Sequence, residues 1–264
     1  MNSDRATSTE QPVGRVSDPP SAHQEPERAG RRPARPQAAW LLGLLQAGDS
    51  FYPTGSYAHS FGLEGLVQEG VVRDRATLRE FVFRSVLPAL RQVELPIAVH
   101  AWEALGAGDW DRLREICVLA SALKAPREAR LASENIGRQR VELVAALRGS
   151  SLAREFLARA DAAKWPCAAA VAAAVEGRVT GAPRAAMLAG LAYATLAAVL
   201  AAAMKLLRLG QNACQALLTE ALGTVPAMIA TAERCPPDEI GWFNPWLDIA
   251  AARHETADAR MFIS

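Results

Sequence analysis

Residues Asp49–Glu64 read DSFYPTGSYAHSFGLE, and this stretch forms a corner between two apolar helical patterns. Pro53 presets its own backbone angle, and the pair Thr54–Gly55 is typical of a turn. Ser56 precedes helical sequence and is expected to be its N-cap. Gly62 falls inside that helical pattern, where glycine is about 1 kcal/mol less favourable than alanine. We therefore expect another backbone to approach Gly62 closely.

Helical patterns fill the chain on both sides of this corner. Hydrophobic residues make up 50% of the chain and aromatic residues only 6%, and alanine is very frequent. Alanine and leucine favour helices, and no useful stretch alternates between apolar and polar residues as a half-buried strand would. We predict an all-α fold, in which residues 38–264 form a single bundle-like domain of about ten helices.

Ala185–Met204 is an uncharged stretch in which half of the residues are alanine. Its length is sufficient to cross a bilayer. Its low hydrophobicity favours instead a buried central helix of a soluble bundle, because small side chains let neighbouring helices approach. We expect no second segment of this kind, and a membrane protein that uses this helix is the alternative.

Several local signals predict where other helices begin, bend and end. Thr77–Glu80 matches a capping box, in which a glutamate follows the cap by three residues. Pro88 and Pro96 interrupt an apolar helical stripe, so kinks or breaks are expected there. Gly177 is expected to end the helix that follows Pro166.

The N-terminal residues 1–37 differ in composition from the rest of the chain. They contain six prolines, six arginines, five acidic residues and no aromatic residue. Such a segment buries too little apolar surface to offset its ordering entropy, so we expect a disordered tail. It lacks the apolar core of a signal peptide, which makes the cytoplasm the default location.

Charge and cysteine spacing exclude several classes of function. The net charge of +1 argues against nucleic-acid binding, which usually requires a basic face. The cysteines fit neither a zinc ribbon nor a CxxC redox pair, and we expect small buried side chains. They are Cys117, Cys167, Cys214 and Cys235.

The C-terminal stretch is unlike a fraying terminus because it is rich in large apolar side chains. These are Trp242, Phe243, Trp246, Met261 and Phe262. Asn244–Pro245 predicts a helix start, with a cap followed by proline at the first helical position. An apolar end of this kind docks onto its own domain or onto a partner, and the residues alone leave both open.

Catalytic motifs are scarce. The chain has no phosphate loop, no GxSxG, no HExxH and no internal repeat. Asp49, His59 and Glu64 lie close in sequence, and an enzyme that uses them for acid–base chemistry is the alternative to a binding protein. No cluster of nickel ligands is present, and we predict neither a metal site nor a cofactor.

Three separated stretches resemble signature sequences of the urease accessory protein UreF family. The first contains Pro53, Gly55, Ser60, Gly62, Leu63 and Glu64. The second is KLLRLGQ at residues 205–211, and the third is HETADARMFIS at residues 254–264, in which Met261 replaces the usual leucine. The matches occur in the family's order, and the resemblance covers about residues 38–264, without the N-terminal tail.

The resemblance implies an all-α adaptor that is not an enzyme. UreF proteins bind the accessory protein UreD, also called UreH, and the complex recruits the GTPase UreG to apo-urease for nickel insertion. A homodimer is also implied. Any nickel would pass by such a protein rather than stay, with His59 as the residue that would touch it.

The resemblance also implies roles for individual residues. The third signature suggests four contacts with partner proteins, at His254, Glu255, Arg260 and Phe262. Lys205 and Arg208 are second choices, because cations at that position also cap a helix. The residues of the first signature are expected to hold the loop that supports the interface.

Overall fold

The structure is a computed structural model that describes residues 38–56, 59–255, 257 and 260–262. The tail expected at residues 1–37 lies outside the described residues. Every regular element in the described part is helical, which confirms the predicted all-α class. The α-helices are α1 (Ala39–Gly48), α2 (Leu63–Gln68), α3 (Arg75–Phe81), α4 (Leu87–Ala89), α5 (Leu95–Ala107), α6 (Trp110–Ala122), α7 (Arg127–Arg148), α8 (Ser151–Ala163), α9 (Ala169–Thr180), α10 (Arg184–Leu206), α11 (Gln211–Leu222), α12 (Val225–Ala232) and α13 (Pro245–His254). Two π-helical segments, η2 (Val82–Val86) and η3 (Leu90–Glu94), and one 3-10 turn, η4 (Pro237–Glu239), complete the set.

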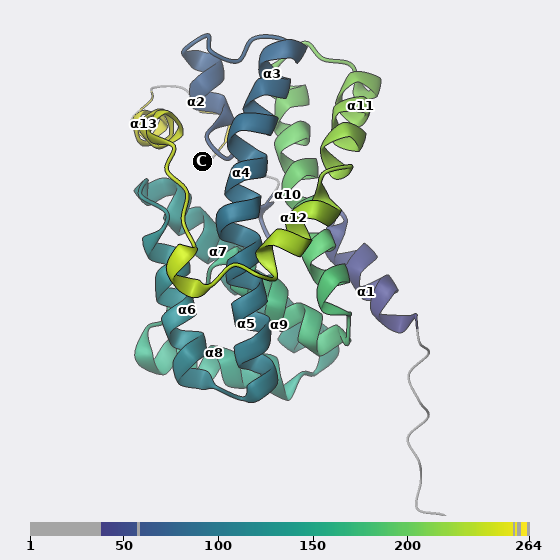
Figure 1. Cartoon of the computed structure of the whole chain (residues 1–264), viewed down its shortest axis with the longest axis vertical. Helices are drawn as coiled ribbons and strands as arrows, with labels where there is room; N and C mark the ends of the chain where they lie inside the picture. The colour runs from purple at the N-terminus through teal and green to yellow at the C-terminus, as the bar shows by residue number, and fades with distance from the viewer. Residues whose placement is uncertain (1–37, 57–58, 256, 258–259, 263–264) are drawn as a thin grey trace, which may run out of the picture. The chain divides into compact units, whose positions relative to one another are not determined.

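The helices of the unit Gln37–Ser264 pack around two alanine-rich helices. The predicted central helix, α10, contacts α1, α2, α5, α9, α11 and α12. Figure 1 shows α10 behind the rod formed by α3, α4 and α5. The inward side of α10 buries Leu188, Leu196 and Val199 completely, as expected for a helix in the interior of a bundle.

The second alanine-rich helix, α9, is the more deeply buried of the two. Every residue from Ala170 to Gly177 is buried. A Cβ atom added to Gly177 would lie 2.7 Å from Cγ of Met187, so only glycine fits there. The prediction that Gly177 ends the helix is therefore wrong. The helix continues past it to a left-handed C-cap at Gly181, where φ is +74°.

We expected kinks or breaks at the two prolines, and the rod from Arg75 to Ala107 stays helical through both, so neither proline breaks it. The π-helical segment η2 precedes Pro88, and η3 precedes Pro96. Proline has no N–H group, and its ring clashes with the carbonyl one turn earlier. A π-turn changes the hydrogen-bond register locally, which lets the helix continue past each proline.

The rod begins with a capping box that differs from the predicted one. The carboxylate of Asp74 accepts the N–H of Thr77 at 2.9 Å, and the hydroxyl of Thr77 accepts the N–H of Asp74 at 3.1 Å. Asp74 is thus the N-cap and Thr77 the third helical residue. The prediction placed the box three residues too late, because threonine can occupy either end of such a motif.

Two stretches of the described chain have the length and composition of a membrane span, Arg184–Leu206 and Gln211–Ala232. The second, which comprises α11 and α12, was not expected from the sequence. Half of the apolar window of α10 is buried against other helices. A core helix of a bundle shows this kind of burial, since it has neighbours on several sides.

Candidate functional site

The corner at residues 49–64 places the first turn of α2 against the C-terminal segment. Gly55 has φ of +78°, which agrees with the predicted turn. The helix begins at Leu63, and Gly62 is its N-cap with φ of +81°. The prediction of Ser56 as N-cap is therefore wrong. Its hydroxyl instead accepts a hydrogen bond from the hydroxyl of Thr54 at 3.2 Å within the loop.

Helix α2 lies so close to α13 that two of its positions have no room for a side chain. A Cβ atom on Gly62 would lie 2.7 Å from Cδ1 of Leu247. A Cβ atom on Gly65 would lie 2.8 Å from the carbonyl oxygen of Ala250. The close backbone approach that we expected at Gly62 thus occurs at Gly65. This contact brings Glu64, which lies between the two glycines, against the C-terminal segment.

Glu64 is the centre of the contacts that hold this segment. Its carboxylate is buried and accepts the N–H of Met261 at 2.7 Å and the N–H of Phe262 at 2.9 Å. It also bonds to Nε2 of His254 at 2.9 Å. The N–H of Glu64 donates to the hydroxyl of the buried Ser60 at 3.2 Å. One side chain thus ties three residues of the chain's end to the corner.

A second carboxylate completes the arrangement. Nδ1 of His254 lies 2.9 Å from Glu128, at the start of α7, and Arg260 donates to the other oxygen of Glu128 at 2.8 Å. Both ring nitrogens of His254 therefore face carboxylates. We call Glu64, Glu128, His254 and Arg260, with the two N–H groups of residues 261 and 262, the C-terminal clasp.

The clasp is surrounded by further contacts from the same segment. Phe262 is buried, and Nζ of Lys205 lies 5.2 Å from the centre of its ring. Arg127 donates to Glu255 at 2.7 Å. All three signature stretches therefore meet here, because Glu64 belongs to the first, Lys205 to the second, and Phe262 to the third.

The electrostatics of the clasp favour an ionised Glu64. Burial raises the pKa of this carboxyl, but the hydrogen bonds from Met261, His254 and Phe262 together outweigh burial and hold the pKa below its ordinary value. His59 lies nearby in the loop, and burial lowers its pKa although Glu128 opposes the shift. The site thus combines a charged network with a histidine that favours the neutral form.

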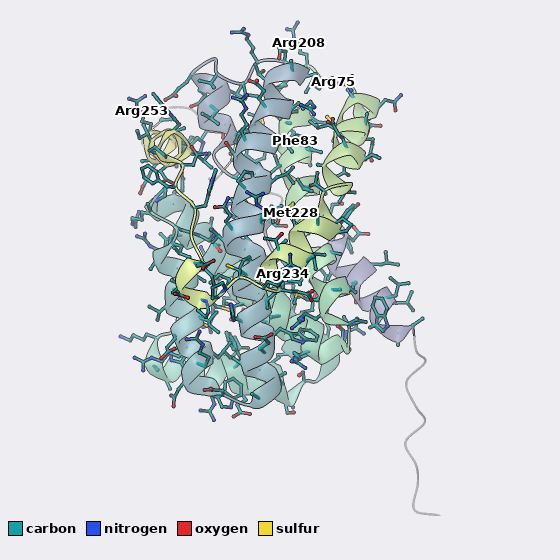
Figure 2. The ribbon with its side chains drawn as sticks, viewed as in Figure 1. Arg75, Phe83, Arg208, Met228, Arg234 and Arg253 are labelled. Atoms are coloured by element: carbon teal, nitrogen blue, oxygen red, sulfur yellow. The ribbon has the colours of Figure 1, made fainter. Side chains whose placement is uncertain are left out.

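The residues that the sequence predicted as partner contacts differ in how exposed they are. His254 and Phe262 are buried within the chain, whereas Glu255 is partly exposed and Arg260 is exposed. Arg208 is exposed just beyond α10 and lies at the upper end of the view, apart from Arg253 on α13 (Figure 2). Whether any of these residues contacts a partner stays a prediction.

Sequence reasoning missed Glu128 altogether. In the sequence, Glu128 is distinguished only by its place in the first turn of a helix. Acidic residues are common there because they interact favourably with the helix dipole. Of the residues in the alternative acid–base cluster, Glu64 bonds to the C-terminal segment through both of its oxygens. Asp49 is exposed and accepts the N–H of Phe51 at 2.8 Å.

No set of His, Cys, Asp and Glu side chains within the described part of the chain is arranged to hold a metal ion. The clasp contains such residue types, but its nitrogen and oxygen atoms bond to one another and to backbone N–H groups. The arrangement of these groups fits a structural role.

Beside the clasp, α13 and the segments before and after it present apolar side chains to solvent. Phe243 is 83% exposed, Trp246 79%, Ile249 44% and Met261 62%. We call these four residues the apolar end patch. Isolated exposed apolar residues are ordinary, but a group around one short helix is typical of a surface that binds another protein.

Fold and site together define an all-α protein whose buried charges hold its own C-terminal segment beside exposed apolar side chains. The sequence model of the UreF family matches residues 72–222, more than half of the chain. The chain belongs to the UreF family of urease accessory proteins.

Individual relatives extend the similarity over most of the chain. A urease accessory protein UreF from Methylibium petroleiphilum is 34% identical over 239 residues, which cover 89% of this chain and 98% of the relative. The UreF of Arthrobacter sp. is 31% identical over 86% of this chain and 98% of its own length. The UreF of Bradyrhizobium diazoefficiens is 30% identical over 91% of this chain and 98% of its own.

Proposed function

We propose that this chain is an adaptor in urease maturation, which binds UreD (UreH) and recruits the GTPase UreG to apo-urease for nickel insertion. The observation that carries the proposal is the C-terminal clasp beside the apolar end patch. The clasp fixes the position of the C-terminal segment, and the patch comprises Met261 of that segment together with exposed residues on α13 and just before it. A preorganised apolar surface binds with less loss of conformational entropy than a flexible one.

Within this surface we assign two kinds of role. His254 and Phe262 are anchors, because their side chains are buried under the segment. Glu255 and Arg260 form a charged rim, which sets orientation and specificity more than affinity. Trp246 and Phe243 supply the large exposed area that interface hot spots use. Lys205 packs against an anchor, so we assign it a supporting part.

We propose that the chain works without catalysing a reaction and without a resident metal. Nickel is then the cargo of the assembly, and His59, at the edge of the clasp, is the residue that would meet it. Cys117, Cys167 and Cys214 are buried free thiols, and Cys235 is a free thiol of intermediate exposure. Free thiols are usual in a reducing compartment, which supports work in the cytoplasm.

The test is co-expression of the full chain with UreD and UreG, followed by size analysis of the complex. Deleting residues 252–264 also removes His254 and leaves Glu64 buried without its partners, so loss of binding would have two explanations. The sharper variant is Phe243→Ser with Trp246→Ser, because both side chains are exposed and outside the clasp. We expect unchanged helical content and loss of UreD binding.

Leu147→Ser provides the matched control. Leu147 is 56% exposed and lies 19 residues after Glu128 in α7, roughly 30 Å along the helix. We expect this variant to bind UreD as the unaltered chain does. Full binding by the double variant, or equal loss in the control, would count against the proposed surface.

We further propose that two copies of the chain associate through the exposed face of α1. Leu42 is 70% exposed and Leu45 63%, and Tyr193 on α10 lies beside Gly48 at the end of this helix. Helix α1 carries no charged residue, so two copies could meet there without like-charge repulsion. Light scattering should show a dimer that Leu42→Glu converts to a monomer, whereas Val118→Glu on exposed α6 should not.

A further inference from the structure

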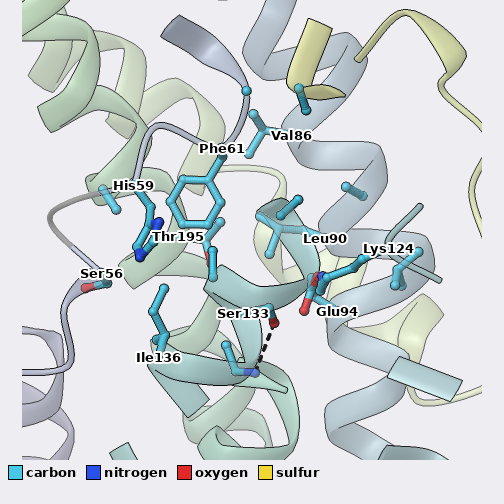
Figure 3. Close-up of a pocket in the computed structure, with 18 of the residues that line it drawn as sticks. Ser56, His59, Phe61, Val86, Leu90, Glu94, Lys124, Ser133, Ile136 and Thr195 are labelled. Atoms are coloured by element: carbon cyan, nitrogen blue, oxygen red, sulfur yellow. Dashed lines mark hydrogen bonds and ion pairs between the residues drawn. The ribbon is translucent and has the colours of Figure 1, made fainter. Parts of the chain in front are cut away.

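A cavity of about 250 Å³, partly open to solvent, lies beneath α13. The rod around α4, the helices α7 and α10, and the inner face of α13 form its walls. Figure 3 shows Phe61, Val86, Leu90, Ile136 and Thr195 arranged around this space. Most of the wall is apolar, and a few polar groups interrupt it, as is usual for a small-molecule site.

The polar groups in the wall differ in whether they have partners. Glu94 forms an ion pair with Lys124, and the hydroxyl of Ser133 accepts the N–H of Ala169 at 3.2 Å (Figure 3). Asp248 lines the same cavity from α13, where it is partly buried. No hydrogen bond or ion pair joins its carboxylate to another residue that the structure describes. Burial accordingly raises the pKa of Asp248.

Both π-helical segments of the rod contribute to the wall of this cavity. Ser85 and Val86 of η2, and Leu90, Val93 and Glu94 of η3, all line this cavity. A π-turn adds one residue to a helical turn and re-aims the side chains around it, and such turns occur frequently at functional sites. The turns that carry the rod past Pro88 and Pro96 therefore also set which of its side chains face the cavity.

We propose that this cavity binds a small amphipathic molecule, whose apolar body fills the space and whose cationic group pairs with Asp248. An apolar cavity of about 150 Å³ accepts benzene, so the larger volume here suits a body of about ten non-hydrogen atoms. A cation complements Asp248, because the other acidic side chains of the wall and its lysine and arginine already have ion-pair partners. The inference is independent of the adaptor role.

The ligand would also bridge two parts of the fold. Helix α13 contributes Leu247, Asp248 and Ala251 to one wall, Trp242 joins them from the segment before α13, and the rod, α7 and α10 contribute the others. A molecule that touches both sides stabilises α13 on the bundle in proportion to its occupancy. Binding should therefore raise the melting temperature and slow amide exchange in α13.

The experiment uses the purified full chain and three probes of similar size. These are 2-phenylethylamine, which is cationic at pH 7.5, 2-phenylethanol, which is neutral, and phenylacetate, which is anionic. Calorimetric titration and ligand-observed NMR measure their affinities. We expect the amine to bind at least about tenfold more tightly than the alcohol, since a charge-assisted hydrogen bond adds to the shared apolar contact. Phenylacetate should bind most weakly.

Two variants and a control locate the binding. Asp248→Asn should remove the advantage of the amine and leave the affinity of the alcohol unchanged. Ala198→Leu places a larger side chain in the cavity and should abolish binding of all three probes. Asp238→Asn alters an exposed aspartate outside the cavity and should change nothing. The proposal would be overturned if no probe binds, or if Asp248→Asn still prefers the amine. The test with Asp248→Asn does not depend on whether Ala198→Leu folds.

Discussion

Replacing Glu64 with glutamine tests the C-terminal clasp directly. The buried carboxylate accepts two backbone N–H groups and faces Nε2 of His254. Glutamine has a similar shape but only one acceptor oxygen, and its amide nitrogen would face a donor. A hydrogen bond to a charged group contributes about 1.5–3 kcal/mol, and an unsatisfied buried donor costs a similar amount. We therefore expect docking of the segment to weaken by about 2–4 kcal/mol.

Amide hydrogen exchange measures this loss locally. Exchange at Ala250, His254 and Phe262 should accelerate by about 30-fold to 1,000-fold, which corresponds to 2–4 kcal/mol. Exchange within α9 should stay unchanged, because α9 is buried elsewhere in the bundle. Glu69→Gln is the matched control. Glu69 lies at the C-terminal end of α2, and its carboxylate forms an exposed ion pair with Arg253 of α13. An exposed pair contributes at most about 1 kcal/mol. Equal effects of the two variants would refute the central role of Glu64.

Four further predictions concern pH and packing. The pKa of Glu64 is lowered in the folded chain, so this carboxylate stabilises the fold fully above about pH 4.5. Its contribution to stability is lost as the pH falls through the lowered pKa. Glu64→Gln should therefore flatten the acid-induced unfolding transition in a circular-dichroism titration. Burial lowers the pKa of His59, so the folded state favours the neutral imidazole and loses stability as the pH falls. The melting temperature of the unaltered chain should therefore decrease between pH 7.5 and pH 5.5. In His59→Gln this decrease should be smaller. Gly137→Ala places a Cβ atom 1.9 Å from the carbonyl oxygen of Cys167 and should reduce the free energy of unfolding by about 3 kcal/mol in urea. Gly190→Ala, whose nearest neighbour is 3.5 Å away, should instead raise it by up to about 1 kcal/mol.

The fold class follows from the sequence because helix formation depends on local pattern and composition. The limits of individual helices were less predictable, and each error has a local cause. Threonine at residue 77 fits either end of a capping box, and the neighbours of Asp74 decide which end it occupies. Gly177 reads as a helix end, but tertiary packing against Met187 requires glycine at that position. Pro88 reads as a break, but a π-turn accommodates it.

The site was predictable only in part. The resemblance to UreF proteins indicated both Glu64 and His254, but assigned one to structure and the other to partner contact. Their hydrogen bond spans 190 residues of sequence, and no periodic pattern encodes a contact of that range. Glu128 had no signal beyond its place in a first turn. Long-range pairing of buried charges becomes visible only when the fold brings the elements together.

A buried charge network also explains why the end of the chain adopts one position rather than several. Burying a carboxylate is costly, and an apolar contact of the same size is often more stabilising. An apolar contact would not distinguish Met261 from Phe262, however, because either side chain could fill the space. The two oxygens of Glu64 bond to two consecutive N–H groups, which fixes the register of this segment to a single residue. In that register Phe262 is buried, whereas Met261 is 62% exposed and belongs to the apolar end patch. A slip of one residue would exchange the two, so the charge network determines which apolar surface the chain presents.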